Sequence, residues 1–122
     1  MRWLVPLTVA ALLSGCSSGP TFSQARQGMT VDPGSSHEVN LEMRQGDTLQ
    51  FSWTSSQDLF FDIHSHRESD TIEWQRKSGT GDSGTFKADL DGGYSLLWEN
   101  DGHTHIILTY SVSGGGKLVS VT

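Results

Sequence analysis

The stretch LFFDIHSHR, which runs from Leu59 to Arg67, alternates between two kinds of side chain with a period of two. Leucine, phenylalanine, isoleucine and serine take one set of positions, and phenylalanine, aspartate and two histidines take the other. Successive side chains of a β-strand point to opposite faces of its sheet, so the stretch predicts a strand with one apolar face turned toward a core. The opposite face carries Phe60, Asp62, His64 and His66.

A second stretch, GHTHIILTY from Gly102 to Tyr110, has the same alternation. It predicts another strand, with His103 and His105 on the face opposite an apolar stripe. Four of the five histidines of the chain therefore lie in two His-x-His pairs. The pairs meet only if their strands are neighbours in the right register, and the sequence leaves that pairing open.

Similar short segments fill the chain from residue 37 to residue 122, separated by turn-forming runs rich in Gly, Asn, Asp and Ser. About eight strands at this spacing are typical of a sandwich or barrel, and no window shows a helical periodicity. We therefore predict an all-β, mainly antiparallel β-sandwich. The expected strands are 38–44, 48–54, 59–67, 71–76, 85–90, 93–100, 102–110 and 117–121.

A packed core must stabilise this domain, because Cys16 is the only cysteine and a disulfide needs two. Large aromatic side chains fall on the faces that the alternation turns inward, and such side chains dominate core energetics. The expected aromatic core comprises Phe51, Trp53, Phe61, Trp74, Phe86, Tyr94 and Trp98.

The first residues resemble the signal of a bacterial lipoprotein. A positive Met1–Arg2 precedes an apolar segment, and LSGC at residues 13–16 resembles the lipobox. The apolar segment is too short to span a bilayer as a helix, which indicates a secretory signal. The resemblance implies that Cys16 is lipidated, and Ser17 in place of an aspartate implies the periplasmic face of the outer membrane in a Gram-negative envelope. An uncleaved anchor and an ordinary signal with a free cysteine are the alternatives.

These features divide the chain into a signal peptide over residues 1–15, a lipidated cysteine with a flexible tether over 16–36, and a folded domain over 37–122. The tether is predicted from its content of Ser, Gly, Gln and Thr and from its lack of periodicity. A short edge strand at Thr30–Val31 is the alternative for its end.

The charge of the chain restricts its partners. It has 8 Lys and Arg against 14 Asp and Glu, with a formal net charge of −6. An acidic surface argues against nucleic acid and against electrostatic docking on anionic lipid. Attachment to a membrane would come from acyl chains on Cys16.

A family resemblance rests on three pieces of the predicted sandwich: LQFSW at residues 49–53, LFFDIH at 59–64, and Gly84–Phe86 followed by GYSLLWEN at 93–100. In this order they resemble the GOLD (Golgi dynamics) domain and its bacterial relatives, over residues 38–121. The resemblance implies a compact β-sandwich that mediates protein or lipid interactions and is not an enzyme. The chain lacks the cysteine pair of many eukaryotic members, so their trafficking role does not carry over.

The His-x-His pairs are the candidate metal site. On neighbouring strands, His64, His66, His103 and His105 would form a grid from which imidazoles reach one ion, and this ligand set suits Cu(II) or Zn(II). Asp62 would join them or orient a histidine ring. The alternatives are solvated outer-face histidines and a pH-responsive cluster, and Phe60 is a candidate contact for a protein partner.

Catalytic motifs are weak by comparison. The GDSG at residues 81–84 resembles the tetrapeptide around a protease nucleophile, but turn formation accounts for it. We therefore expect a lipid-anchored envelope binding module that binds a divalent metal and is not an enzyme. A structural or protein-interaction lipoprotein is the main alternative, and a metal-dependent hydrolase with Asp62 or Glu68 as base is the lesser one. The sequence does not indicate an oligomeric state.

Overall fold

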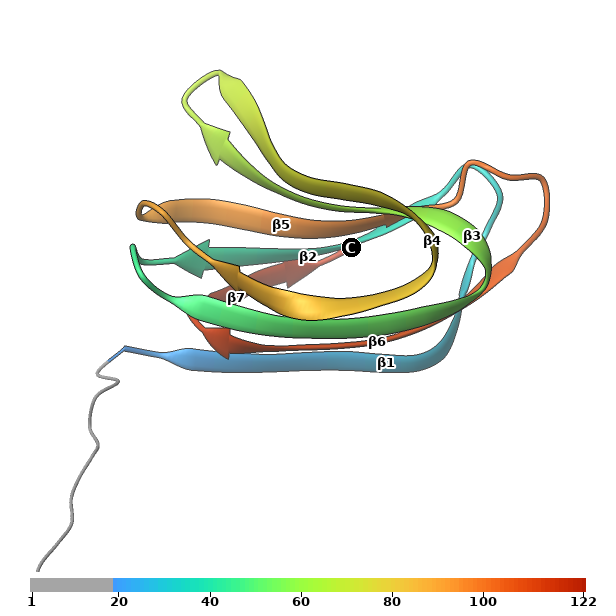
Figure 1. The fold of residues 1–122 in the computed structure, drawn as a ribbon, viewed down its shortest axis with the longest axis horizontal. Coiled ribbons are helices and arrows are strands. Elements are labelled where there is room, and N and C mark those ends of the chain that lie inside the picture. The colour runs from blue at the N-terminus through green and yellow to red at the C-terminus, as the bar shows by residue number, and fades with distance from the viewer. Residues whose placement is uncertain (1–18) are drawn as a thin grey trace, which may run out of the picture.

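The computed structural model describes residues 19–122, and over this range the chain is the antiparallel all-β sandwich that the sequence predicts (Figure 1). No helix in this range is long and apolar enough to cross a membrane. The predicted signal peptide and the predicted lipidation site, Cys16, both lie outside the described residues. The strands are β1 (Thr21–Val31), β2 (Ser36–Met43), β3 (Thr48–Arg67), β4 (Asp70–Lys87), β5 (Gly92–Glu99), β6 (Ile106–Gly115) and β7 (Lys117–Val121).

The seven strands form one sheet in the order β1-β6-β3-β5-β2-β7, with β4 paired to β3. The sheet folds over on itself into two layers, because the long strands β3 and β4 pass from one layer to the other (Figure 1). Layer I contains β1, β6, the first half of β3 and the second half of β4. Layer II contains β7, β2, β5, the second half of β3 and the first half of β4. The edges of the sheet approach each other where Gly116 N donates to Pro20 O at 2.9 Å.

The length of β3 differs from the prediction, which placed two strands and a turn in the same segment. Residues 55–58 stay extended, and the register with β4 shifts between Thr54 and Leu59. Ser55 Oγ donates to Gln57 O at 2.7 Å at this point. Small polar side chains therefore allow a bend within one strand. Strand β4 is likewise continuous, because it runs through Gly79 and Gly81, between the predicted strands 71–76 and 85–90.

The predicted tether is wrong from Thr21 onward. Residues 21–31 pair with β6 along the edge of layer I, and Phe22 and Val31 are buried. The sequence did not predict this strand, because one of its inward positions carries the polar Gln24 and because its register with β6 shifts between Arg26 and Met29.

The core lies between the layers and confirms most of the predicted aromatic set. Phe61 contacts Phe51, Trp53 and Trp98 with ring centroids 5.1, 5.5 and 5.3 Å apart. Phe86 is only partly buried against this core. Trp74 lies outside it, because it sits at a register shift of β4, is 37% exposed and donates from its indole N–H to Ser65 Oγ at 2.9 Å. The buried aliphatic residues are Val31, Val39, Leu41, Met43, Leu49, Leu59, Ile63, Ala88, Leu96, Ile106, Leu108 and Val112.

Candidate functional site: a buried polar cluster on layer II

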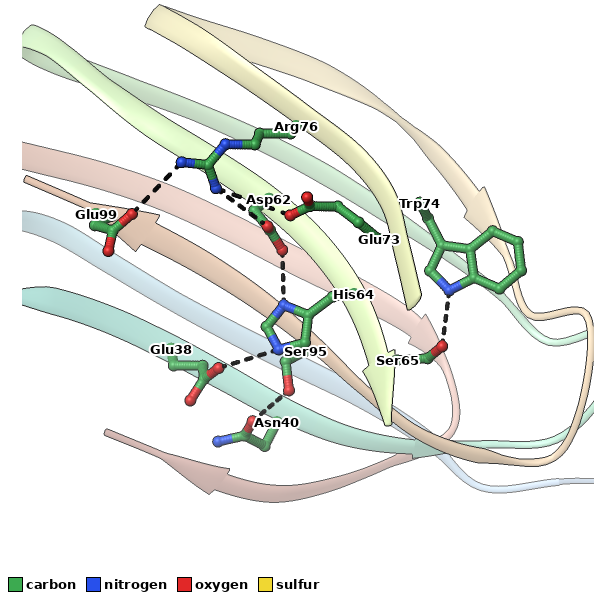
Figure 2. Close-up of polar contacts among 10 residues, drawn as sticks. All are labelled: Glu38, Asn40, Asp62, His64, Ser65, Glu73, Trp74, Arg76, Ser95 and Glu99. Carbon is green, nitrogen blue, oxygen red and sulfur yellow. Dashed lines mark hydrogen bonds and ion pairs between the residues drawn. The ribbon is translucent and has the colours of Figure 1, made fainter. Parts of the chain in front are cut away.

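The outer face of layer II carries a row of polar residues that crosses its strands. The register places Asn40 of β2 opposite Ser95 of β5, Ser95 opposite His64 of β3, and His64 opposite Glu73 of β4. Directly opposed residues lie about 4.5–5.5 Å apart, which lets their side chains meet. Figure 2 shows this polar cluster, which comprises Glu38, Asn40, Asp62, His64, Glu73, Arg76, Ser95 and Glu99.

The centre of this cluster is buried although it lies on an outer face. Asp62 is 4% exposed, His64 7% and Ser95 2%. Ser95 Oγ donates to Asn40 Oδ1 at 2.5 Å, and Asn40 Nδ2 donates to Ser120 Oγ at 3.0 Å. Buried polar groups are costly unless they are hydrogen-bonded, so this network is needed to keep them there.

His64 is held between two carboxylates. Its Nδ1 lies 2.7 Å from Asp62 Oδ1, and its Nε2 lies 3.6 Å from Glu38 Oε2 (Figure 2). Asp62 accepts the Nδ1–H, which assigns the Nδ1 tautomer to a neutral ring. In that tautomer Nε2 carries a lone pair, and a carboxylate oxygen of Glu38 lies 3.6 Å from it.

Arg76 balances part of this negative charge. Its guanidinium lies 3.5 Å from Asp62 Oδ2 and 3.8 Å from carboxylate oxygens of both Glu73 and Glu99. A hydrogen bond with Asp62 raises the pKa of the Glu73 carboxyl, with a smaller contribution from burial. Three carboxylates thus face one arginine, and Glu38 adds a fourth on the other side of His64, which leaves the cluster electronegative when His64 is neutral.

His66 is the exposed neighbour of His64, and its ring meets the His64 ring edge-on with centroids 4.8 Å apart. Beside it lies a hollow of about 200 Å³. The hollow forms because Gly93, which pairs with both Glu42 and His66, has no side chain between them. His66 therefore borders open space on a side where a ligand has room.

The second His-x-His pair lies elsewhere. His103 and His105 are exposed in the loop before β6, which begins only at Ile106, and His105 Nδ1 lies 2.9 Å from Asp32 Oδ1. The Asn100 side chain shapes this loop, because it accepts from Gly102 N and donates to Thr104 O, both at 2.9 Å.

The pairing of β3 explains why the two histidine pairs are not brought together. Thr104 of the loop donates to Gln57 at 2.8 Å, and Gln57 precedes His64 by roughly 20 Å of strand at about 3.3 Å per residue. Strand β6 pairs with the first half of β3, whereas His64 and His66 lie in its second half, beside β5. Among residues 19–122, no group of three or more His, Cys, Asp or Glu stands ready-made to hold a metal ion.

Sequence reasoning found Asp62, His64 and His66 but missed Glu38, Glu73 and Arg76. The signal for Glu38 was its alternation with Val39 and Leu41 in a predicted strand. No such signal exists on β4, because a register shift at Trp74 turns Glu73 and Arg76 to the same face. Phe60 is half-buried, and the Arg76 guanidinium stacks on its ring at 4.6 Å, which covers one side of this candidate partner contact.

The fifth histidine, His37, is buried in the core instead. Its Nε2 lies 2.8 Å from the Tyr110 hydroxyl, which also accepts from Gln24 Nε2 at 3.2 Å. Burial lowers the pKa of His37, and the nearby charge of Arg26 adds to this effect. His37 connects β2 of layer II to β6 of layer I and faces no open site.

No protein-family model and no curated protein sequence matches the chain. The chemistry of the cluster is therefore inferred from its own atoms: an imidazole nitrogen, an exposed second imidazole and an excess of carboxylates, which together suit a cation.

Proposed function

We propose that the protein is a lipid-anchored binding module of the cell envelope, not an enzyme, and that its layer II cluster binds Cu(II) or Zn(II). The observation that carries the proposal is the 3.6 Å separation between His64 Nε2 and Glu38 Oε2. Both atoms bear lone pairs when the ring is neutral, so a proton or a metal ion must lie between them for the contact to be favourable.

The separation suits a metal ion. Two ligands on a tetrahedral ion with bonds of about 2.0–2.1 Å lie about 3.3 Å apart. Asp62 would hold the ring from the far side, as carboxylates commonly do for metal-bound histidines. His66 is the third ligand in this proposal, and its exposed side chain has room to rotate toward the ion.

The anchor is proposed from the lipobox resemblance at residues 13–16, with Cys16 carrying the acyl chains at the periplasmic face of the outer membrane. Only residues 17–20 separate Cys16 from β1. A segment this short spans at most about 14 Å, so the domain would lie close to the lipid surface. Mass spectrometry of the membrane-extracted protein tests this part, since Cys16→Ser should remove the acyl mass.

Calorimetry with Cu(II) and Zn(II) tests the metal site. We expect one saturable site in the protein, weakened at least about tenfold by His64→Ala and by His66→Ala. The double variant His103→Ala/His105→Ala is the matched control, because it removes the same kind of side chains from the distant loop, and it should bind as the parent does.

The result that overturns the metal proposal is the absence of saturable binding, or equal losses in the two sets of variants. In that case the acidic face of layer II would favour the alternative, a protein-interaction module without metal. Loss of binding at low pH alone would not decide between them, since protonation competes with metals at any imidazole site.

A further inference from the structure

The chain enters the sandwich at one end, where three turns lie together. Strand β1 begins at this end, and Pro20 O accepts from Gly116 N at 2.9 Å there. Gly46 N donates to Ala88 O at 2.9 Å, which joins the β2–β3 turn to the β4–β5 turn. We call this the entry end of the sandwich and define it by its turns, residues 44–47, 87–92 and 115–117 (Figure 1).

Arg44 connects these turns to the segment that leads back to Cys16. Its Nη1 would lie only 3.4 Å from a β-carbon placed on Gly19, so the guanidinium lies beside the chain just before β1. Pro20, Arg44 and Lys117 also line one hollow of about 190 Å³. The segment from Cys16 to Gly19 spans at most about 11 Å. Acyl chains on Cys16 would therefore hold the entry end within about this distance of the lipid surface.

The entry end also exposes apolar side chains. Leu90 lies in its β4–β5 turn and is 48% exposed, and Trp74 is 37% exposed. An aromatic row connects them: the Trp74 ring lies 5.9 Å from Phe86, and Phe86 lies 5.5 Å from Tyr94. The Tyr94 hydroxyl then donates to Leu90 O at 2.7 Å. The two exposed side chains therefore belong to one packed cluster at this end.

This composition suits the boundary between water and lipid. Tryptophan is enriched at membrane surfaces, and arginine and lysine side chains beside it keep their charged groups among the lipid headgroups. Arg67 fits this description, because its guanidinium stacks on Trp74 at 5.3 Å and pairs with Asp89. Net charge contributes little, because the three turns carry equal numbers of cations and carboxylates: Arg44, Lys87 and Lys117 against Asp47, Asp89 and Asp91.

We propose that the entry end docks on the lipid surface that holds the anchor, with Leu90 and Trp74 among the headgroups. This inference rests on the lipid anchor of the proposed function, because the short segment after Cys16 brings this end to the membrane. The strands run away from the entry end (Figure 1), so they would stand upright on the lipid. The outer face of layer II, with His64 and Glu38, would then remain open to the solvent.

Quenching of tryptophan fluorescence by brominated phosphatidylcholine tests this proposal. The full acylated protein is extracted from membranes and reconstituted into vesicles of this lipid. Trp3 belongs to the predicted signal peptide, and Trp53 and Trp98 are 2% and 0% exposed, so Trp74 should account for most of the quenching. We expect Trp74→Phe to lower the quenching at least about threefold. Trp53→Phe is the matched control, because it makes the same change at a buried position, and it should keep the quenching.

A fluorescent label repeats the test independently of Trp74. The proposed lipidation consumes the Cys16 thiol, so an environment-sensitive nitrobenzoxadiazole label can be attached to Leu90→Cys alone. Ile107→Cys is the matched control, because Ile107 is 44% exposed and pairs with Thr30 at the far end of β1. We expect the emission to shift to the blue on vesicles at position 90 and to stay unchanged at position 107.

The docking proposal is overturned if Trp74→Phe is quenched as strongly as the parent protein, if the labels at positions 90 and 107 shift equally, or if neither shifts. Mass spectrometry of the same samples separates the two proposals. An acylated protein without these signals contradicts only the docking of the entry end, whereas a protein without acyl chains contradicts the anchor and the docking together.

Discussion

On the outer face of layer II, β3 presents Asp62 and His64, which are 4% and 7% exposed; on the outer face of layer I, the same strand presents Ser52 and Thr54, which are exposed. The change occurs across the bend at residues 55–58. One strand therefore supplies both faces, and its side chains differ in how far they depend on their neighbours.

This difference follows from the cost of burying charge. Asp62 is buried, so it needs the His64 N–H and the Arg76 guanidinium to offset its lost hydration. A hydroxyl on layer I remains in contact with water and needs no partner. Single substitutions on the outer face of layer II should therefore lower stability, whereas those on the outer face of layer I should be tolerated.

Asp62→Ala gives the largest expected effect. Removing one member of a buried charge network leaves the others unpaired, so we expect the free energy of unfolding to fall by about 3 kcal/mol. Urea denaturation followed by tryptophan fluorescence measures this change. Asp58→Ala is the control, since Asp58 is exposed at the bend of the same strand and should change stability little. Equal losses in the two variants would remove the distinction between buried and exposed acids.

The core and the layer II site differ in how much of them the sequence predicts. Alternation located the inward faces of β2, β3 and β5, because burial selects apolar side chains at every second position. The same alternation placed Asp62 and His64 together on the opposite, outer face of β3. It did not locate Glu73 and Arg76, since a register shift breaks the period of two on β4.

The sequence also could not predict that the two histidine pairs lie apart. Their separation depends on which half of β3 pairs with β6, and β3 bends at a point where its residues resemble an ordinary turn. Local composition specifies small polar residues there but does not distinguish a bend within a strand from a loop between two strands.

A change of pH should have an effect of intermediate size on stability, and it distinguishes His37 in the core from the charged groups on the outer face of layer II. The folded pKa of His37 is lowered below its usual 6.5, so below pH 6.5 the unfolded chain takes up a proton that the folded protein does not. Stability should therefore fall as the pH decreases from 7 to 5. His37→Gln should reduce this slope in thermal denaturation.

Glu73 acts in the opposite direction. Its pKa is raised, so its protonation favours the folded state as the pH decreases toward its folded value, and Glu73→Gln should steepen the loss on acidification. Glu73 is half-exposed, so this change should be small. An acid-induced loss that disappears in Glu73→Gln and persists in His37→Gln would assign the sensitivity to layer II and contradict this prediction.

The smallest expected effect compares two serines that differ only in the face they occupy. Ser95 on layer II is 2% exposed and donates to Asn40 Oδ1 at 2.5 Å, whereas Ser52 on the outer face of layer I is exposed. Ser95→Ala leaves the partly buried side-chain carbonyl of Asn40 without this donor, so it should lower the free energy of unfolding by about 1 kcal/mol. Ser52→Ala should change it by less than about 0.5 kcal/mol. Because the substitution is identical, a loss at Ser52 as large as that at Ser95 would mean that the outer face of layer I, too, is held by a network of hydrogen bonds and is not an open surface.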